Sequence, residues 1–207
     1  MNSIDAKHLT RFLINTNQEL IRKTAIKHCH AYGLHSFIIN ESPKIRLFIA
    51  ESGCELNKNN MPLGVFNPGA PIIPIHPHKY DDLFITMSGV LNHHIYCENG
   101  KEPQTRYNVY SRHTLKAYTY RRLNDKHKIE GCGQHTLSYL GYKNDLLLGA
   151  KTLHTVTTEG ETSWLIIETF KDDKFEQIAY HQNLLERPEL YQEFKNEDPI
   201  DFINLFI

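Results

Sequence analysis

Short stretches rich in β-branched and aromatic residues alternate with polar turn clusters through the middle of the chain. Stretches of this length and composition are typical of β-strands. Turn formers such as Asn67-Pro68-Gly69, Gly131-Cys132-Gly133 and Glu159-Gly160 separate them, and a further turn is expected at Gly89. Many short strands at near-regular spacing favour a sandwich or barrel over a sheet with crossover helices. The expected strands are Ile45–Ala50, Leu83–Ser88, Leu91–Cys97, Thr105–Tyr110, Leu115–Arg122, Thr136–Leu140, Leu153–Thr157 and Ser163–Phe170.

The N-terminal region, residues 3–32, has the pattern of a helix. Thr16 followed by Glu19 fits a capping box, in which each side chain satisfies a free backbone N–H at a helix start. Gly33 is suited to end the helix. The inward-facing stripe expected from four-residue spacing consists of Ile21, Ala25 and Cys29.

The C-terminal region, from about residue 174 to 207, is again expected to be helical. Pro188 suits the first turn of one helix, and Asp198 followed by Pro199 fits the N-cap and first position of another. The apolar end of the chain is predicted to pack on the β-region or on a second subunit, so a homodimer stays open. Its apolar residues are Phe202, Ile203, Leu205, Phe206 and Ile207.

These zones predict one domain of 207 residues, with an N-terminal helical region at 1–36, a β-barrel at 37–171 and a C-terminal helical region at 172–207. Lys and Arg number 23 against 24 Asp and Glu, which gives no basic surface for nucleic acid. No apolar run is long enough to span a membrane, and early charged residues argue against a secretory signal. The four cysteines form no CxxC pair, and we expect reduced thiols in a cytoplasmic protein.

The chain contains 13 histidines, and two of them form a His-x-His pair. In an extended strand, side chains two apart point to the same face, so His76 and His78 could share one metal ion. Imidazole is a good ligand for Fe, Zn, Cu and Ni. Pro77 stiffens the pair and suits the rim of a sheet. Three residues separate His78 from a carboxylate, Asp82, and six more separate Asp82 from Gly89.

This layout resembles the first motif of the cupin family, in which a glycine precedes His-x-His, followed by a glutamate and a second glycine. Gly69, His76, His78, Asp82 and Gly89 occupy those places, with aspartate where the family has glutamate. The resemblance covers about residues 65–170 and implies a double-stranded β-helix, or jelly-roll barrel, while the helices expected at both ends lie outside it. It also implies a further ligand from a second motif on a later strand.

The counterpart expected for that second motif is His154, in a β-rich stretch before the Glu159-Gly160 turn. His76, His78 and His154 would then hold the metal. Asp82 would be either a fourth ligand or a group that orients a histidine through its other ring nitrogen. The resemblance implies a divalent ion, with Fe(II) expected and Zn, Ni or Mn as alternatives.

Other histidines gain no metal role from their positions. His28 and His30 lie two apart on the predicted helix, point to different faces and are expected to face solvent. His93 and His94 are adjacent on a strand, so only one of them can face the interior, where it would either line the cavity or belong to the core.

A set of three histidines without a glutamate ligand is similar to that of the thiol dioxygenases within the cupins. The resemblance implies a mononuclear non-haem oxygenase acting on a small-molecule substrate. Asp82 and Tyr96 are the candidate catalytic residues, and Arg106, Arg112, Arg121 and Arg122 are candidate partners for a substrate carboxylate. Two alternatives stay open: an isomerase or lyase that uses the metal as a Lewis acid, and a cupin that binds a small molecule without catalysis.

Overall fold

The computed structural model describes residues 3–57, 72–98, 106–112, 120–141, 143–171, 178–181, 187 and 190–207, with the side chains of 3, 106–112, 120–128 and 171 left aside. The helices are α1 (Ser3–Thr16), α2 (Gln18–Thr24) and α3 (Pro199–Asn204). The strands are β1 (Leu34–Glu41), β2 (Lys44–Ala50), β3 (Tyr80–Glu98), β4 (Arg106–Arg112), β5 (Tyr120–Ser138), β6 (Asp145–Leu148), β7 (Leu153–Lys171) and β8 (Ile178–His181).

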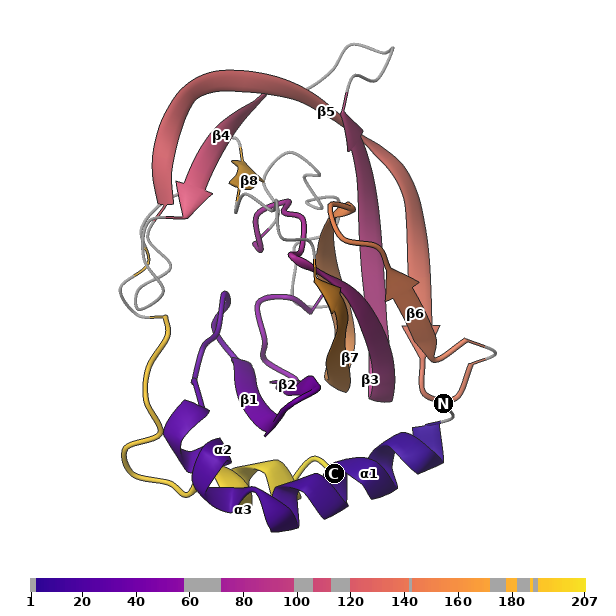
Figure 1. Cartoon of the computed structure of the whole chain (residues 1–207), viewed down its shortest axis with the longest axis vertical. Coiled ribbons are helices and arrows are strands. Elements are labelled where there is room, and N and C mark those ends of the chain that lie inside the picture. Colours follow the sequence, from indigo (N-terminus) through magenta and orange to yellow (C-terminus); the bar gives the residue numbers. More distant parts are fainter. Residues whose placement is uncertain are drawn as a thin grey trace.

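The strands form an antiparallel sheet in the order β1-β2-β7-β3-β5-β4-β8, with β6 paired to β3. Strand β7, late in the chain, therefore lies between the two earlier strands β2 and β3. Within the described ranges the sheet is not closed into a barrel (Figure 1). The prediction of a mainly β fold with helices at both ends is confirmed, whereas the jelly-roll barrel is not.

The three longest strands each run through a position where the sequence predicted a turn. Strand β3 continues through Gly89, β5 through Gly131, and β7 through Gly160. The expected turns are therefore wrong, and the registers show bulges instead. Ser88 pairs with Ser163 and Val90 pairs with Glu159, so one residue of β3 opposes three of β7. Glycine supplies the backbone freedom that such a bulge needs as readily as that of a turn.

The N-terminal helical prediction holds for only part of its range. The helix breaks at Asn17, whose side chain donates to Ile39 O, and it ends at Thr24. Thr16 closes α1 and its hydroxyl donates to Phe12 O, so the predicted capping box is wrong. Beyond α2 the chain is not helical: residue 26 pairs with Ser36 of β1, and residue 27 pairs with Gln192 of the C-terminal segment.

The C-terminal region combines a short strand with the last helix. Strand β8 lies where helix was expected, because Ala179 and Tyr180 pair with β4. The predicted N-cap of α3 is confirmed: the Asp198 carboxylate accepts from Ile200 N at 3.0 Å, with Pro199 in the first helical position. In the part of the chain that the structure describes, no helix is both long and apolar enough to cross a membrane.

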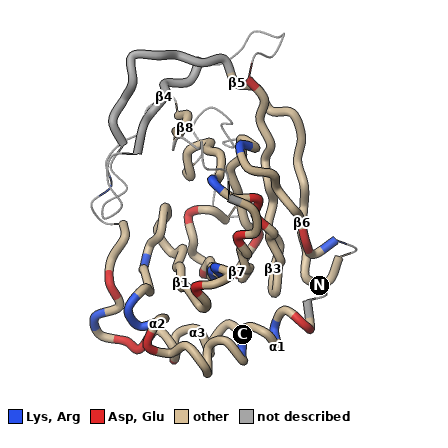
Figure 2. Tube along the Cα trace, viewed as in Figure 1, with Lys and Arg blue, Asp and Glu red and all other residues tan. Residues whose placement is uncertain are grey.

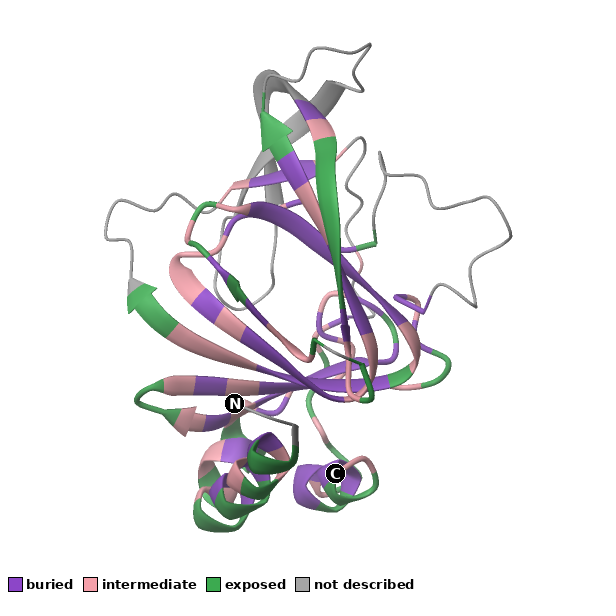
Figure 3. Ribbon diagram, turned by 90° about the vertical axis from the view of Figure 1, so that its right-hand side faces the viewer, coloured by how far each residue is buried: buried purple, intermediate pink, exposed green. Residues whose placement is uncertain are grey.

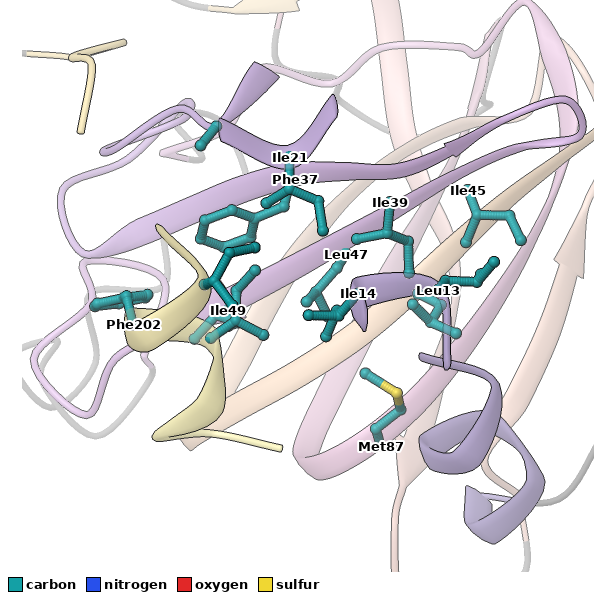
Figure 4. Close-up of a cluster of buried hydrophobic side chains, with 14 of the residues drawn as sticks. Leu13, Ile14, Ile21, Phe37, Ile39, Ile45, Leu47, Ile49, Met87 and Phe202 are labelled. Carbon is teal, nitrogen blue, oxygen red and sulfur yellow. The ribbon is translucent and has the colours of Figure 1, made fainter. Parts of the chain in front are cut away.

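Two apolar clusters bury opposite faces of the sheet. The three helices pack together against one face (Figures 1 and 3), where Ile14, Phe37 and Phe202 belong to the cluster drawn in Figure 4. The other face carries a second cluster that includes Phe84, Val156 and Trp164. Because both faces are covered, the strands read as β-rich runs without strict alternation of polar and apolar residues.

Ion pairs join the two ends of the chain beside the helices. The Arg22 guanidinium donates to the Asp198 carboxylate at 2.8 Å, and Lys27 Nζ donates to Glu197 at 2.7 Å. Basic and acidic positions meet where α2 approaches the segment before α3 (Figure 2). These contacts attach the C-terminal segment to α2 and to the residues that follow it.

Two of the four cysteines form a disulfide. Cys97 on β3 and Cys132 on β5 are joined, with their Cα atoms 5.9 Å apart. The expectation of four reduced thiols is therefore wrong for this pair, because adjacent strands bring together residues that are 35 apart in the sequence. Cys29 and Cys54 are buried thiols, and burial raises the pKa of Cys54 to about 12.

Candidate metal centre

The backbone brings the predicted histidines from two distant segments to one point. His76 and His154 face each other as an antiparallel pair, each N–H donating to the other's carbonyl at 3.1 Å. Side chains of directly paired residues share one face of the sheet. His78 lies two residues beyond His76, so an extended chain returns it to the same side. This pairing is why all three rings converge.

The three imidazole rings meet through their Nε2 atoms. His78 Nε2 lies 3.2 Å from His76 Nε2 and 2.9 Å from His154 Nε2. Two ligands about 2.1 Å from one ion would be about 3.0 Å apart at a right angle and about 3.4 Å apart at a tetrahedral angle. His76, His78 and His154 form a group that could hold a metal ion, and it is the one such group of histidine, cysteine or acidic residues among those the structure describes.

Each ring has its other nitrogen, Nδ1, occupied by a protein group. His76 Nδ1–H donates to Pro74 O at 2.8 Å, and His78 Nδ1–H donates to the Asp82 carboxylate. His154 Nδ1 lies 3.3 Å from Nδ1 of His93. A neutral imidazole that donates through Nδ1 presents a lone pair at Nε2. The structure thus holds at least His76 and His78 as acceptors toward the shared point.

Burial favours the neutral form of the deepest rings. Desolvation and then the neighbouring His78, His76 and His93 rings hold the pKa of His154 well below its ordinary value. Burial, with smaller contributions from nearby histidines led by His78, lowers the pKa of His93 to about 3. Both rings are therefore neutral near pH 7, which is the state in which histidine binds a metal.

Asp82 contacts a ligand candidate rather than the shared point. Its Oδ2 accepts from His78 Nδ1, on the side of the ring opposite Nε2. Its Oδ1 is buried and has no hydrogen-bond partner among the described residues. This geometry corresponds to the alternative in which Asp82 orients His78. A buried carboxylate is costly unless a positive charge lies near it.

Phe84 supplies the apolar side of the site. Its ring lies edge-on to His93 at 4.5 Å and to His154 at 5.7 Å between centroids, and 5.9 Å from His78. Phe84 belongs to the apolar cluster on the sheet face away from the helices. His154 is buried, whereas His76 and His78 are half-buried. The site formed by the three Nε2 atoms is therefore shielded from solvent on the His154 side and accessible on the side of His76 and His78.

Several predicted residues lie away from the three rings or outside the described residues. Tyr96 pairs with Leu153, next to the pair Ile95 and His154, so its side chain lies on the opposite face of the sheet from His154. There it packs with Ile75 and Tyr180, and its catalytic role stays a prediction. Outside the described side chains lie Gly69, Pro188, Arg106, Arg112, Arg121 and Arg122.

The adjacent pair on β3 behaves as the alternation predicted. His93 is buried beside His154, whereas His94 is half-buried and bonds Thr157 Oγ1 at 3.0 Å. Which of the two would face inward was not readable from the sequence, because no neighbouring residue fixes the phase of the strand. The contact between His93 and His154 is thus a finding of the structure.

His28 and His30 also differ from their prediction. They lie in the irregular segment after α2 and are half-buried rather than solvent-facing. His28 Nδ1 accepts from Gly33 N at 3.0 Å and its ring stacks on Tyr32. The His30 ring lies 6.4 Å from that of His76. No sequence motif indicates that His30 lies near His76. Its position depends on the pairing of the segment after α2 with the C-terminal segment.

Comparison of the chain with protein-family models and with curated proteins gives no match. The functional argument therefore stands on the geometry of the three histidines and of the groups that orient them.

Proposed function

We propose that this protein depends on one divalent metal ion, which is held by His76, His78 and His154. The convergence of three Nε2 atoms carries the proposal, since that of His78 lies 3.2 Å from that of His76 and 2.9 Å from that of His154. When both rings are neutral, each donates through Nδ1 and accepts through Nε2, so His76 and His78 cannot hydrogen-bond to each other across the 3.2 Å that separates them. A cation between the lone pairs resolves this conflict.

The surrounding groups fit such an ion. The Asp82 carboxylate, buried with one oxygen unpartnered among the described residues, would compensate part of its charge through His78. Phe84 would exclude water from the His154 side. A divalent ion with three imidazole ligands supplies Lewis acidity and keeps coordination positions for a small molecule and, in the case of iron, for dioxygen.

The reaction class we propose is oxygenation of a small molecule at an Fe(II) ion. Non-haem iron oxygenases use three protein ligands on one side of the metal and leave the other side open. Here the half-buried His76 and His78 stand on the accessible side, and buried His154 closes the inner side. The chain's own residues would hold the ligand geometry and exclude water, while substrate binding would bring the reacting groups together.

Metal content tests the ligand set. We expect about one equivalent of metal per chain after purification with divalent ions supplied, and loss of most of it in His76→Ala and His78→Ala. Asp82→Ala should lose less, because its carboxylate acts through His78. His8→Ala, an exposed histidine on α1, is the matched control and should retain full occupancy. Equal metal content in wild type and His78→Ala would refute the proposed site.

Oxygen consumption tests the reaction class. With Fe(II) loaded anaerobically, dioxygen uptake should depend on an added small-molecule substrate and should vanish in His78→Ala. Turnover without dioxygen, with Zn in place of Fe, would replace the oxygenase by Lewis-acid isomerase or lyase chemistry. Metal retention without turnover on any substrate of a broad panel would leave a binding protein.

A further inference from the structure

Two segments far apart in the sequence are joined beside the metal centre. Lys27 N donates to Gln192 O at 2.7 Å, and Gln192 N donates to Lys27 O at 3.0 Å. Tyr191 N also donates to His28 O at 3.1 Å. These bonds hold residue 191 against residues 28–30, the irregular segment that follows α2.

Two residues at this junction, His30 and Tyr191, have an unusual backbone. His30 has φ 70° and Tyr191 has φ 59°, the left-handed region that bulky residues rarely adopt. This conformation is unfavourable for such residues and persists where the surrounding structure imposes it. Such residues cluster at ligand sites, so the pair warrants a functional explanation.

The two side chains form a hydrogen-bonded pair next to a metal ligand. The Tyr191 hydroxyl lies 2.8 Å from His30 Nδ1, and the rings meet edge-on with centroids 5.6 Å apart. The His30 ring in turn lies 6.4 Å from the His76 ring, inclined by 24°. His30 is not a member of the three-histidine group, so it stands beside the ion's position rather than on it.

The hydrogen bond between Tyr191 and His30 allows the His30 ring to donate a second hydrogen bond through Nε2. When the Tyr191 hydroxyl donates to His30 Nδ1, the neutral imidazole carries its proton on Nε2 and donates from there. The centre itself would be cationic, because three neutral imidazoles leave the ion with its full charge and Asp82 compensates only one unit. A small anion is the ligand that such a centre prefers.

We infer that His30 and Tyr191 position a small anionic ligand on the metal, with His30 donating a hydrogen bond to it and Tyr191 fixing the His30 ring. This inference rests on the proposed metal centre. It assigns to the site a wall that comes from the N-terminal and C-terminal segments, outside the strands that supply the metal ligands. The pair is a positioning pair and supplies no ligand to the ion.

The test uses the full chain loaded with Co(II), with azide as the anionic probe and the Co(II) absorption bands as the signal. Tyr191→Phe and His30→Ala should bind Co(II) as wild type does, with the same azide-free spectrum. Each should bind azide about 5–10-fold more weakly, the equivalent of one hydrogen bond. His30→Asn should recover part of the affinity, because asparagine tolerates the left-handed backbone and offers an N–H donor.

Tyr32→Phe is the matched control, because Tyr32 lies in the same segment and its ring stacks on His28. It should leave azide affinity unchanged. Equal azide affinity in wild type, Tyr191→Phe and His30→Ala would overturn the inference while the metal centre stands. Loss of Co(II) in Tyr191→Phe would also overturn it, since the pair would then serve only to hold the structure. Absence of Co(II) from the wild type would instead remove the metal centre itself.

Discussion

Individual histidines in this protein are distinguished by what their second nitrogen contacts. A backbone carbonyl, a carboxylate and another imidazole orient the three ligand candidates. The spacing of His76 and His78 on an extended segment allowed that pair to be selected, and the resemblance to the cupin family, with the β-rich setting of residue 154, added His154. It could not reveal the partner of His154, since the contact with His93 depends on the register between β3 and β7.

Replacing the buried partner of His154 should weaken metal binding. In His93→Leu, the His154 Nδ1–H loses its acceptor, and removal of such an orienting group typically costs 10–100-fold in metal affinity. His93→Gln, which keeps an acceptor oxygen, should lose less. Competition with a chromophoric chelator gives the affinities. His94→Leu, on the opposite face of the same strand, is the control, and an equal loss there would contradict the assignment.

Long strands with internal bulges are the elements that build the site. β3 carries Asp82, Phe84 and His93 along one strand because it does not turn at Gly89. The sequence correctly indicated β-structure on both sides of Gly89 and Gly160, whereas the expected strand before Gly131 ended at Arg122. It could not distinguish a turn from a bulge, because both need the same backbone freedom at that residue and differ only in which strand lies alongside.

Alanine at two glycines should separate backbone strain from steric conflict. Gly89 and Gly160 both have φ +68°, but a Cβ at Gly160 would meet nothing within 4 Å, whereas one at Gly89 would lie 2.9 Å from Thr162 Cα. We expect Gly160→Ala to lower the free energy of unfolding by about 1 kcal/mol and Gly89→Ala by about 3 kcal/mol or more. Urea denaturation measures both. Equal losses would mean that the bulge relaxes around the new side chain.

At the scale of the whole molecule, the helices and the sheet meet around a buried histidine. His35 on β1 packs against Phe202 of α3, with ring centroids 4.7 Å apart. Burial, followed by the nearby charges of His28 and Lys27, lowers its pKa to about 3. Glu51 lies 3.4 Å from its Nε2 without offsetting these effects. The His35 ring, packed between the sheet and α3, is therefore neutral near pH 7.

Stability should accordingly fall in acid. The folded-state pKa of His35 lies below the unfolded value of about 6.5, so the unfolded chain binds the proton more tightly. The contribution of His35 to the free energy of unfolding is complete above about pH 6.5 and is lost as the pH falls toward 3. The loss is about 2 kcal/mol at pH 5. In His35→Leu, the unfolding free energy should change less between pH 7.5 and pH 5 than in wild type. His8→Ala should keep the wild-type slope, and an unchanged slope in His35→Leu would contradict this account.

The insertion of β7 between β2 and β3 has a consequence for biosynthesis. As the chain leaves the ribosome, β2 and β3 emerge with their shared neighbour still untranslated, so both present bare edges that are prone to aggregation. The proposed ligands His76 and His78 are likewise synthesised well before His154, the third ligand. Ribosome-bound intermediates should therefore neither complete the sheet nor bind the ion until β7 has emerged, and chaperone contact should concentrate in that interval.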